Sequence, residues 1–208
     1  MASKLNKILV LGNSPHINEI DFDLIDPRIK TIGVNRIWLK HYPNYFFFND
    51  VPILNELDLP EHKISKIKLI QNSICYSSQW IRKSPGVAIP NWVRIYPISD
   101  RTFFPDSVSN SIKIFKDQII RGSSISDYVF YIAGVNLNWS DPSHFWKTMG
   151  YPSRGNHNNQ VWYERRFNAM LSNFIKLKDS GVNMVSVTPG SRLNKIMRYE
   201  NISNLYIK

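Results

Sequence analysis

Asn13, Asn35 and Asn49 each follow a short apolar run within two residues, and the first run covers residues 8–11. An asparagine side chain carries two N–H donors and an acceptor oxygen, which suits it to reading the edge of a pyrimidine or the hydroxyls of a sugar. Asparagine also favours turns and helix caps, so a single one would indicate little. Three at corresponding positions favour a shared binding site.

Gly12 and Ser14 flank the first of these asparagines, and Asp50 follows the third. A glycine at a strand end lets the backbone approach a phosphate or a ribose, and unpaired amide groups supply donors there. The segment lacks the three glycines of a dinucleotide fingerprint and the lysine of a P-loop. An ordinary strand-to-loop turn therefore remains open beside a nucleotide site.

The apolar runs that precede the asparagines are too short for buried helices and fit central strands of a parallel sheet. Residues 91–96, 127–134 and 182–187 fit further strands. Residues 66–70 alternate lysine with apolar side chains, which predicts a half-exposed strand. Residues 51–62 contain two prolines and are expected to form a short connection.

Two segments fit helices. Residues 107–120 form the first, and from Gln160 onward apolar residues recur with a period of 3.6, which marks one face of a long helix. Gly181 is expected to cap the end of that helix. The alternation of strands and helices predicts an α/β fold with a mainly parallel sheet and helices on both faces, in a single domain over residues 1–208.

Six groups of short motifs resemble, in the same order, those of the bacterial sialyltransferases that decorate lipo-oligosaccharide and of the wider Rossmann-like group related to the hydroxymethylpterin pyrophosphokinase domain. Each motif is degenerate, and their combination is what is specific. The resemblance implies a Rossmann-like fold and a glycosyltransferase that takes a sugar from a uridine- or cytidine-linked donor. The motifs lie at residues 12–15 with 20–23, 31–35, 47–50, 121–124, 134–136 with 144–145, and 187–191.

The resemblance also implies which residues bind the nucleotide sugar. Arg121 precedes a pair of small hydroxyl residues, as in the family, and its guanidinium offers a fixed fork of donors for the phosphate. The hydroxyls would add short hydrogen bonds. The expected nucleotide-sugar site consists of Gly12, Asn13, Ser14, Asn35, Asn49, Asp50, Arg121, Ser123, Ser124 and Asn136.

Transfer of a sugar needs a base to take the proton from the acceptor hydroxyl and a group to neutralise the departing phosphate. Histidine suits the first task because its ordinary pKa of about 6.5 lies near working pH. His157 stands in a polar loop before the long helix, where the family places its catalytic histidine, and His144 is the second candidate. For either residue, an imidazole that only ties down a loop remains the alternative.

Residues 140–160 are rich in proline, glycine, asparagine and aromatic residues and lack apolar periodicity, which is typical of an active-site lid. Tyr151 and Arg154 are expected to assist phosphate binding from this lid, although Arg154 could equally be a surface charge. In the family, a helix of several turns follows the hydroxyl pair, whereas here only two residues separate Ser124 from the strand that begins at residue 127. If that helix is deleted, one face of the sheet needs another cover, which a homodimer could supply.

Asp21 and Asp23 form an acidic pair of the kind that many glycosyltransferases use to hold a divalent metal. Here the pair follows the first glycine loop rather than a later strand, and the resembling family works without a metal. The sequence also lacks Cys/His ligand spacing. We therefore expect no catalytic metal and no cofactor beyond the nucleotide sugar as co-substrate.

The chain carries 26 Lys and Arg against 16 Asp and Glu, a net charge of +10. Such an excess attracts polyanions through long-range attraction and counterion release, although a protein can also be merely basic. Residues 196–208 carry few charges and no basic amphipathic stripe, so we expect no membrane partner. Double-stranded DNA is the expected polyanion.

The single cysteine, Cys75, rules out an internal disulfide and fits a reducing compartment. We interpret Cys75 as a packing residue. No apolar run approaches the ~20 residues that cross a bilayer, and the first residues lack a secretory apolar region. We expect a cytoplasmic protein, in the host cytoplasm if it is viral.

Two classes of function remain. The first is a glycosyltransferase, and its expected acceptor is a hydroxymethylated base, 5-hydroxymethylcytosine, in bacteriophage DNA. A sialyltransferase-like enzyme acting on oligosaccharide is the alternative. The second class is a catalytically inactive nucleic-acid-binding module in which tryptophans such as Trp92 stack on bases, although core packing explains most of them. Pyrophosphoryl transfer would need acidic metal ligands that the sequence does not clearly supply.

Overall fold

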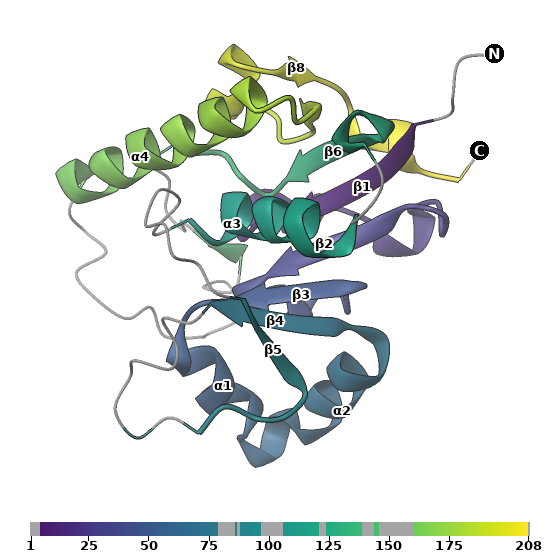
Figure 1. Cartoon of the computed structure of the whole chain (residues 1–208), viewed down its shortest axis with the longest axis vertical. Helices are drawn as coiled ribbons and strands as arrows, with labels where there is room; N and C mark the ends of the chain where they lie inside the picture. Colours follow the sequence, from purple (N-terminus) through teal and green to yellow (C-terminus); the bar gives the residue numbers. More distant parts are fainter. Residues whose placement is uncertain are drawn as a thin grey trace.

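The structure is a computed structural model. It describes residues 5–78, 86, 88–96, 106–120, 124–138, 144–145 and 160–207. Eight strands form one sheet in the order β5-β4-β3-β2-β1-β6-β7-β8, and neighbouring strands pair in parallel throughout (Figure 1). The strands are β1 (Asn6–Leu11), β2 (Lys30–Val34), β3 (Tyr45–Phe48), β4 (Ile74–Ser78), β5 (Val93–Tyr96), β6 (Tyr128–Ala133), β7 (Met184–Ser186) and β8 (Arg198–Tyr199).

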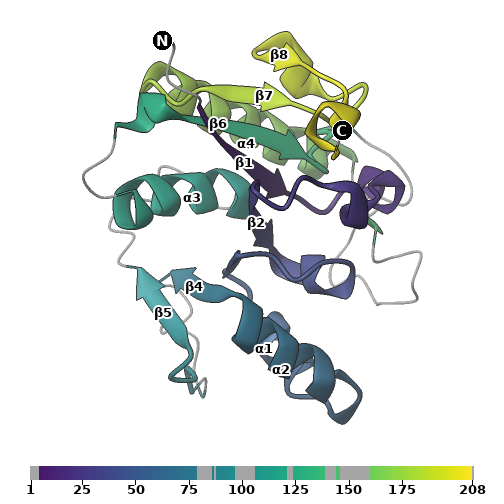
Figure 2. The same cartoon turned by 90° about the vertical axis from the view of Figure 1, so that its right-hand side faces the viewer.

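Helices cover both faces of this sheet (Figures 1 and 2). The side chains of residues 8–11 in β1 show why this run is apolar: Leu9 and Leu11 belong to one core cluster, and Ile8 and Val10 to the other. Successive side chains of a strand point to opposite faces, so a strand covered on both sides needs apolar residues at every position. The predicted α/β, Rossmann-like fold is confirmed.

Each core cluster has its own pair of helices. α1 (Val51–Leu57) and α2 (Lys63–Asn72) cover the first face, together with short turns such as η1 (Pro15–Glu19). α3 (Ser107–Ile114) and α4 (Gln160–Asp179) cover the second. The predicted apolar face of α4 packs into this second cluster, with Phe174 and Leu177 buried.

The cap of α4 at Gly181 and the packing of Cys75 agree with what the sequence predicts. Gly181 has a φ of +83°, the left-handed conformation of a C-terminal cap. Cys75 lies buried in β4, and burial raises the pKa of its thiol to about 12. A thiol in this state is inert at neutral pH, so Cys75 is the packing residue that was expected.

Three expectations for residues 51–78 were wrong. Residues 51–57 form a helix because a proline in the first turn, Pro52 here, loses no hydrogen bond and favours the helical φ. Residues 66–70 belong to α2 rather than to a strand. The strand on this side of the sheet is β4, which was not predicted.

The strand beginning near residue 127 is confirmed as β6, preceded by one short turn, Ile125–Asp127. No helix of several turns therefore stands between Ser124 and β6, and the helix that precedes this strand, α3, lies before Ser124 in the chain. The face of the sheet that was expected to need another cover is covered within the chain, because Phe130 and Ile132 pack against α3 and α4. A homodimer is not needed to cover this face.

Candidate functional site

The strand order reverses at β1. From β1 the chain builds β2 to β5 on one side, and then returns to place β6 on the other side of β1. In open parallel sheets, ligands bind in the crevice at the carboxyl ends of the strands where the order reverses. The loops that follow β1 and β6 therefore form the expected floor of a site.

The three predicted asparagines lie at this edge of the sheet. Asn13 comes after β1, Asn35 directly follows β2 and Asn49 directly follows β3. These strands are parallel neighbours, so their carboxyl ends share one edge. Asn136, after β6, lies at the same edge beside the loop of β1.

Backbone hydrogen bonds at Gly12 and Ser14 join the loop after β1 to the loop after β6. The N–H of Gly12 donates to the carbonyl of Ala133 at 2.8 Å, and the N–H of Ser14 donates to the carbonyl of Gly134 at 2.8 Å. A Cβ on Gly12 would lie 2.4 Å from the oxygen of Gly134 and 2.7 Å from a methyl of Val135. Only glycine permits the loops after β1 and β6 to approach this closely.

The loop after β1 contains three polar atoms that are buried without a hydrogen-bond partner among the described residues. They are the Oδ1 of Asn13, the Oγ of Ser14 and the Nε2 of His16. The Nδ1 of His16 lies 2.9 Å from the carboxylate of Glu19, so one ring nitrogen is paired and the other is not. Each buried, unpaired polar group costs about 1–3 kcal/mol. Such a cluster is typical of a site where a ligand supplies the missing partners.

Asn35 and Asn49 also have structural roles. Asn35 has a φ of +51°, a left-handed conformation that asparagine tolerates better than most residues, and its Oδ1 lies 3.5 Å from the hydroxyl of Ser107. The Oδ1 of Asn49 accepts a hydrogen bond from the N–H of Ser78 at 3.3 Å. Their presence at the edge is therefore partly explained by the backbone.

Arg36, which is buried, and Glu56, which is half-buried, form an ion pair next to these loops. The Nε of Arg36 donates to Glu56 at 2.7 Å, and a second guanidinium nitrogen binds the other carboxylate oxygen. The pair ties the turn after β2 to α1. Sequence reasoning missed it, because the two residues stand 20 positions apart.

Asp50 lies at the start of α1 and combines two properties. Asp50 is exposed to solvent, yet desolvation of its carboxyl by the surrounding protein is the largest influence on its pKa and raises it. A residue in a groove combines solvent exposure with a raised pKa, because water reaches the side chain while nearby protein atoms partly desolvate its carboxylate. Arg166 and Arg36 oppose the rise, which places two positive charges near Asp50.

Asp106 is a second carboxyl near this edge that the sequence did not suggest. It is buried and caps α3, where it accepts hydrogen bonds from the N–H of Val108 at 2.9 Å and the hydroxyl of Ser109 at 2.5 Å. Burial raises the pKa of Asp106 to about 6, although both hydrogen bonds and the charge of Arg166 lower it. Arg166 thus influences both Asp50 and Asp106, so its guanidinium lies near both carboxyls.

Ser124 lies away from the asparagines. It caps the short turn before β6, and β6 begins at Tyr128, which pairs with Asn6 at the amino end of β1. A strand rises roughly 3.3 Å per residue. The six residues of β6 therefore separate Ser124 from the carboxyl edge. The order of the elements explains this placement, because α3 begins beside Asn35 at the carboxyl edge and leads back to Phe115, which packs on Tyr128, before the chain reaches Ser124.

Of the expected lid, the structure describes His144 and Phe145. The N–H of Phe145 donates to the carbonyl of Asn13 at 3.0 Å, and its ring is fully buried. This part of the segment therefore packs directly on the loop after β1. The other predicted residues, namely His157, Arg121, Ser123, Tyr151 and Arg154, lie outside the described residues.

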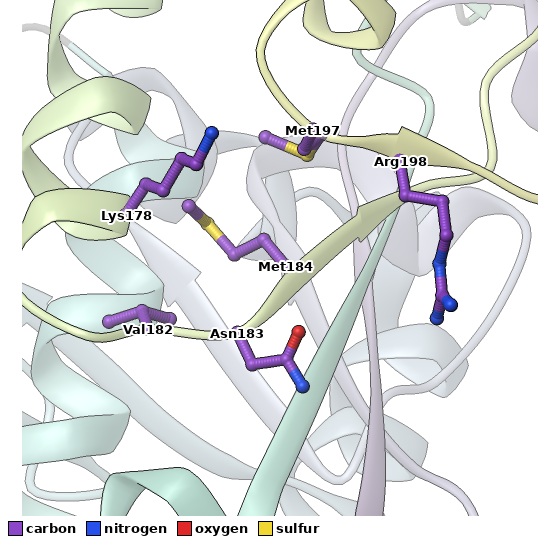
Figure 3. A pocket seen from close by; sticks show the side chains of 6 residues that line it. All are labelled: Lys178, Val182, Asn183, Met184, Met197 and Arg198. Atoms are coloured by element: carbon purple, nitrogen blue, oxygen red, sulfur yellow. The ribbon is translucent and has the colours of Figure 1, made fainter.

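A hollow of about 180 Å³ lies at a different place, at the amino end of β7 (Figure 3). This volume is below the ~300–1,000 Å³ of ligand pockets. Its two cations are engaged, because Lys178 donates to the carbonyl of Ile196 at 2.7 Å and Arg198 pairs with Glu200 at 2.6 Å. We therefore place the functional site at the carboxyl edge and not in this hollow.

The described residues were expected to hold neither a catalytic metal nor a membrane-spanning segment. They contain no group of three or more His, Cys, Asp or Glu side chains that could hold a metal ion. The acidic pair Asp21 and Asp23 instead shapes a turn, with the carboxylate of Asp21 accepting from the N–H of Asp23 at 3.1 Å. No helix in this part of the chain has the length and apolar character to span a bilayer.

Comparison with known proteins identifies the fold. No family model and no curated protein matches the sequence. The fold is similar to the sialyltransferase CstII from Campylobacter jejuni in complex with cytidine-5'-monophosphate, with 12% identity over 100% of this chain and 89% of that chain and a TM-score of 0.51. A CST-II complex with a trisaccharide acceptor and CMP gives 12% identity, 97% and 89% coverage and a TM-score of 0.55. The expected resemblance to bacterial sialyltransferases is confirmed at the level of the fold.

Proposed function

We propose that this protein is a glycosyltransferase that moves a sugar from a cytidine-linked donor to a hydroxyl of an oligosaccharide. The single observation that carries the proposal is the group of unpartnered polar atoms of Asn13, Ser14 and His16 at the point where the strand order reverses. The fold likeness supports the choice of donor and acceptor, because the similar structures hold CMP and a trisaccharide acceptor.

The reaction requires one proton transfer and one bond exchange. The acceptor hydroxyl gives its proton to a base and attacks the anomeric carbon, while the bond between that carbon and the phosphate oxygen breaks. We propose His157 as the base, with His144 as the alternative. His144 is the neighbour of Phe145, which packs on the loop of Asn13.

The departing phosphate needs positive charge at the carboxyl edge. Ser124 lies toward the amino edge, which argues against the hydroxyl pair after Arg121 as the phosphate partner. Arg36 and Arg166 influence Asp50 at the correct edge. We propose that these two arginines together neutralise the phosphate.

The first experiment measures nucleotide binding. CMP should raise the melting temperature of the wild type, because a ligand that binds only the folded state stabilises it. Asn13→Ala should weaken CMP binding about 5- to 150-fold, the equivalent of ~1–3 kcal/mol for a lost buried hydrogen bond. The free variant should be no less stable than the wild type, because an unpaired buried oxygen is removed.

Asn204→Ala is the matched control, because Asn204 is exposed on the turn Ile202–Leu205, away from the carboxyl edge. Its CMP affinity should equal that of the wild type. Unchanged affinity in Asn13→Ala would remove Asn13 from the site. If neither CMP nor a uridine nucleotide changes the melting temperature, the glycosyltransferase proposal fails and the non-catalytic binding module is favoured.

The net charge of +10 favours a second acceptor, hydroxymethylated bases in double-stranded DNA. A 5-hydroxymethyl group already projects into the major groove, where a protein can reach it. Mass spectrometry after incubation with CMP- and UDP-sugars should find the sugar on the oligosaccharide if the first acceptor is correct. An adduct on hydroxymethylcytosine DNA, with binding that weakens steeply with salt, would favour the second.

A further inference from the structure

The outer surface of α2 is more apolar than its inner surface. Ile64 is 70% exposed, Ile67 45% and Ile70 39%, whereas Leu69 is the one residue of this helix that is buried. A surface helix normally turns its apolar side chains inward. These outward isoleucines also explain why the alternating sequence of residues 66–70 resembled a half-exposed strand.

The exposed isoleucines are neighbours on the helix. Residues three apart lie next to each other on a helix surface, so Ile64, Ile67 and Ile70 form a stripe along α2. Leu59 and Ile74, which stand just before and after this segment, are 42% and 37% exposed. We name the stripe, together with the lysines of the same helix, the α2 face. The lysines are Lys63, Lys66 and Lys68.

The charge of the α2 face has one sign. The ten residues of α2 include three lysines and no Asp or Glu. The Nζ of Lys66 contacts Asp58, and the Nζ of Lys68 lies 5.8 Å from the centre of the Tyr42 ring. The partner of this face must therefore accept apolar side chains and carry negative charge.

Three kinds of partner can be compared on these properties. A second copy of the chain would bring α2 against α2 and place lysines opposite lysines, which is unfavourable. Nucleic acid would satisfy the lysines, but isoleucines contribute nothing to phosphate contacts. An anionic membrane surface satisfies both, because acidic headgroups attract lysines and the boundary below them accepts apolar side chains.

We propose that the α2 face docks reversibly on anionic membrane surfaces, with Ile64 and Ile67 entering the headgroup boundary. The helix is ten residues long, so it lies on the surface and does not span the bilayer. It belongs to the side of the sheet formed by β3 to β5 (Figure 2). Docking through this side leaves the loops after β1 and β6 uncovered.

Vesicle co-sedimentation tests this proposal with the full chain. Wild-type protein should bind vesicles of phosphatidylcholine with 30% phosphatidylglycerol at least tenfold more tightly than pure phosphatidylcholine vesicles. The double variant Ile64→Ser, Ile67→Ser should bind the anionic vesicles at least fivefold more weakly, and so should Lys63→Gln, Lys68→Gln. Both variants change exposed side chains, so their melting temperatures should stay close to that of the wild type.

Matched controls lie elsewhere on the surface. Ile207→Ser changes an isoleucine that is 59% exposed, and Lys176→Gln changes an exposed lysine of α4, and both should bind like the wild type. Equal binding of the α2 variants and these controls would overturn the proposal. Loss of binding only in the lysine variant, with displacement by DNA, would assign the face to nucleic acid. A dimer in sedimentation equilibrium that Ile64→Ser, Ile67→Ser dissociates would assign it to a second copy.

Discussion

Gly12→Ala tests the close contact between the loops after β1 and β6. Gly12 is not among the glycines with positive φ, so alanine is compatible with its backbone and the cost comes from packing alone. The new Cβ would lie 2.4 Å from the oxygen of Gly134 and 3.0 Å from its carbonyl carbon. Both are backbone atoms of the adjoining loop and cannot rotate away.

The structure sets the size of the effect. Overpacking a tight site costs ~1–3 kcal/mol. Moving the loops apart also weakens the two 2.8 Å bonds donated by Gly12 and Ser14, at ~0.5–1.5 kcal/mol each. Gly12→Ala should therefore lose ~2–6 kcal/mol of unfolding free energy, seen as a lower urea midpoint with an unchanged slope.

Gly181→Ala separates packing from backbone strain. A Cβ on Gly181 meets nothing within 4 Å, so that variant should lose only the ~1–2 kcal/mol of a left-handed residue. Gly12→Ala should also bind CMP more weakly, whereas Gly181→Ala should bind it like the wild type. A Gly12→Ala protein within ~1 kcal/mol of the wild type would refute the close approach of the two loops.

Two further predictions concern carboxyls near the site. Glu56→Gln should lose up to ~3–5 kcal/mol of unfolding free energy in urea, because it removes the carboxylate that pairs with the buried guanidinium of Arg36. Glu61→Gln, at an exposed position, should be neutral, and a neutral Glu56→Gln would contradict the ion pair. In the folded protein the pKa of Asp106 is about 6, against an ordinary value of 3.8 for an aspartate, so the folded state binds more protons than the unfolded state between these values. The stability of the protein therefore falls as pH rises from about 4 to 6. Asp106→Asn keeps a capping side chain and removes this cost, so relative to the wild type it should gain roughly 3 kcal/mol between pH 4 and pH 7, at ~1.4 kcal/mol per pKa unit. A difference between the two proteins that does not change with pH would contradict the raised pKa.

The central strands could be predicted from the sequence because their burial on both faces leaves a clear pattern. β1, β2 and β3 each contain a short run of buried apolar residues, and an asparagine follows each run within two residues. The long helix α4 was equally clear, because one face alone is apolar and a glycine ends it. In these elements, local sequence and tertiary burial agree.

The region from residue 51 to residue 78 could not be predicted, because sequence pattern and burial disagree there. α2 buries Leu69 and exposes three isoleucines, so its apolar residues do not mark the core. β4 contains Ser77 and Ser78, both buried, and the hydroxyl of Ser77 is satisfied by the carbonyl of Phe48 at 2.6 Å. A buried serine in a strand does not look like a core residue in the sequence, so the burial of β4 could not be predicted from residue type.

The site was predicted where it depends on strand ends and missed where it depends on distant partners. The edge positions of Asn13, Asn35 and Asn49 follow from their place after parallel strands. His16 could have been found, because it stands in the same loop and is one of five histidines. Asp106 could not, because only the packed structure shows its burial.

The position of Ser124 connects the fold to the proposed chemistry. In this chain α3 precedes Ser124, and the turn capped by Ser124 leads directly into the amino end of β6, whereas a site at the crevice would need its phosphate partners at the carboxyl end. The proposed site would therefore take positive charge from another element. α4 is placed to supply it, because Arg166 influences Asp50 after β3 and Asp106 at the start of α3. The same helix packs on α3 through its apolar face, so one element both covers the sheet and brings an arginine to the edge where the asparagines lie.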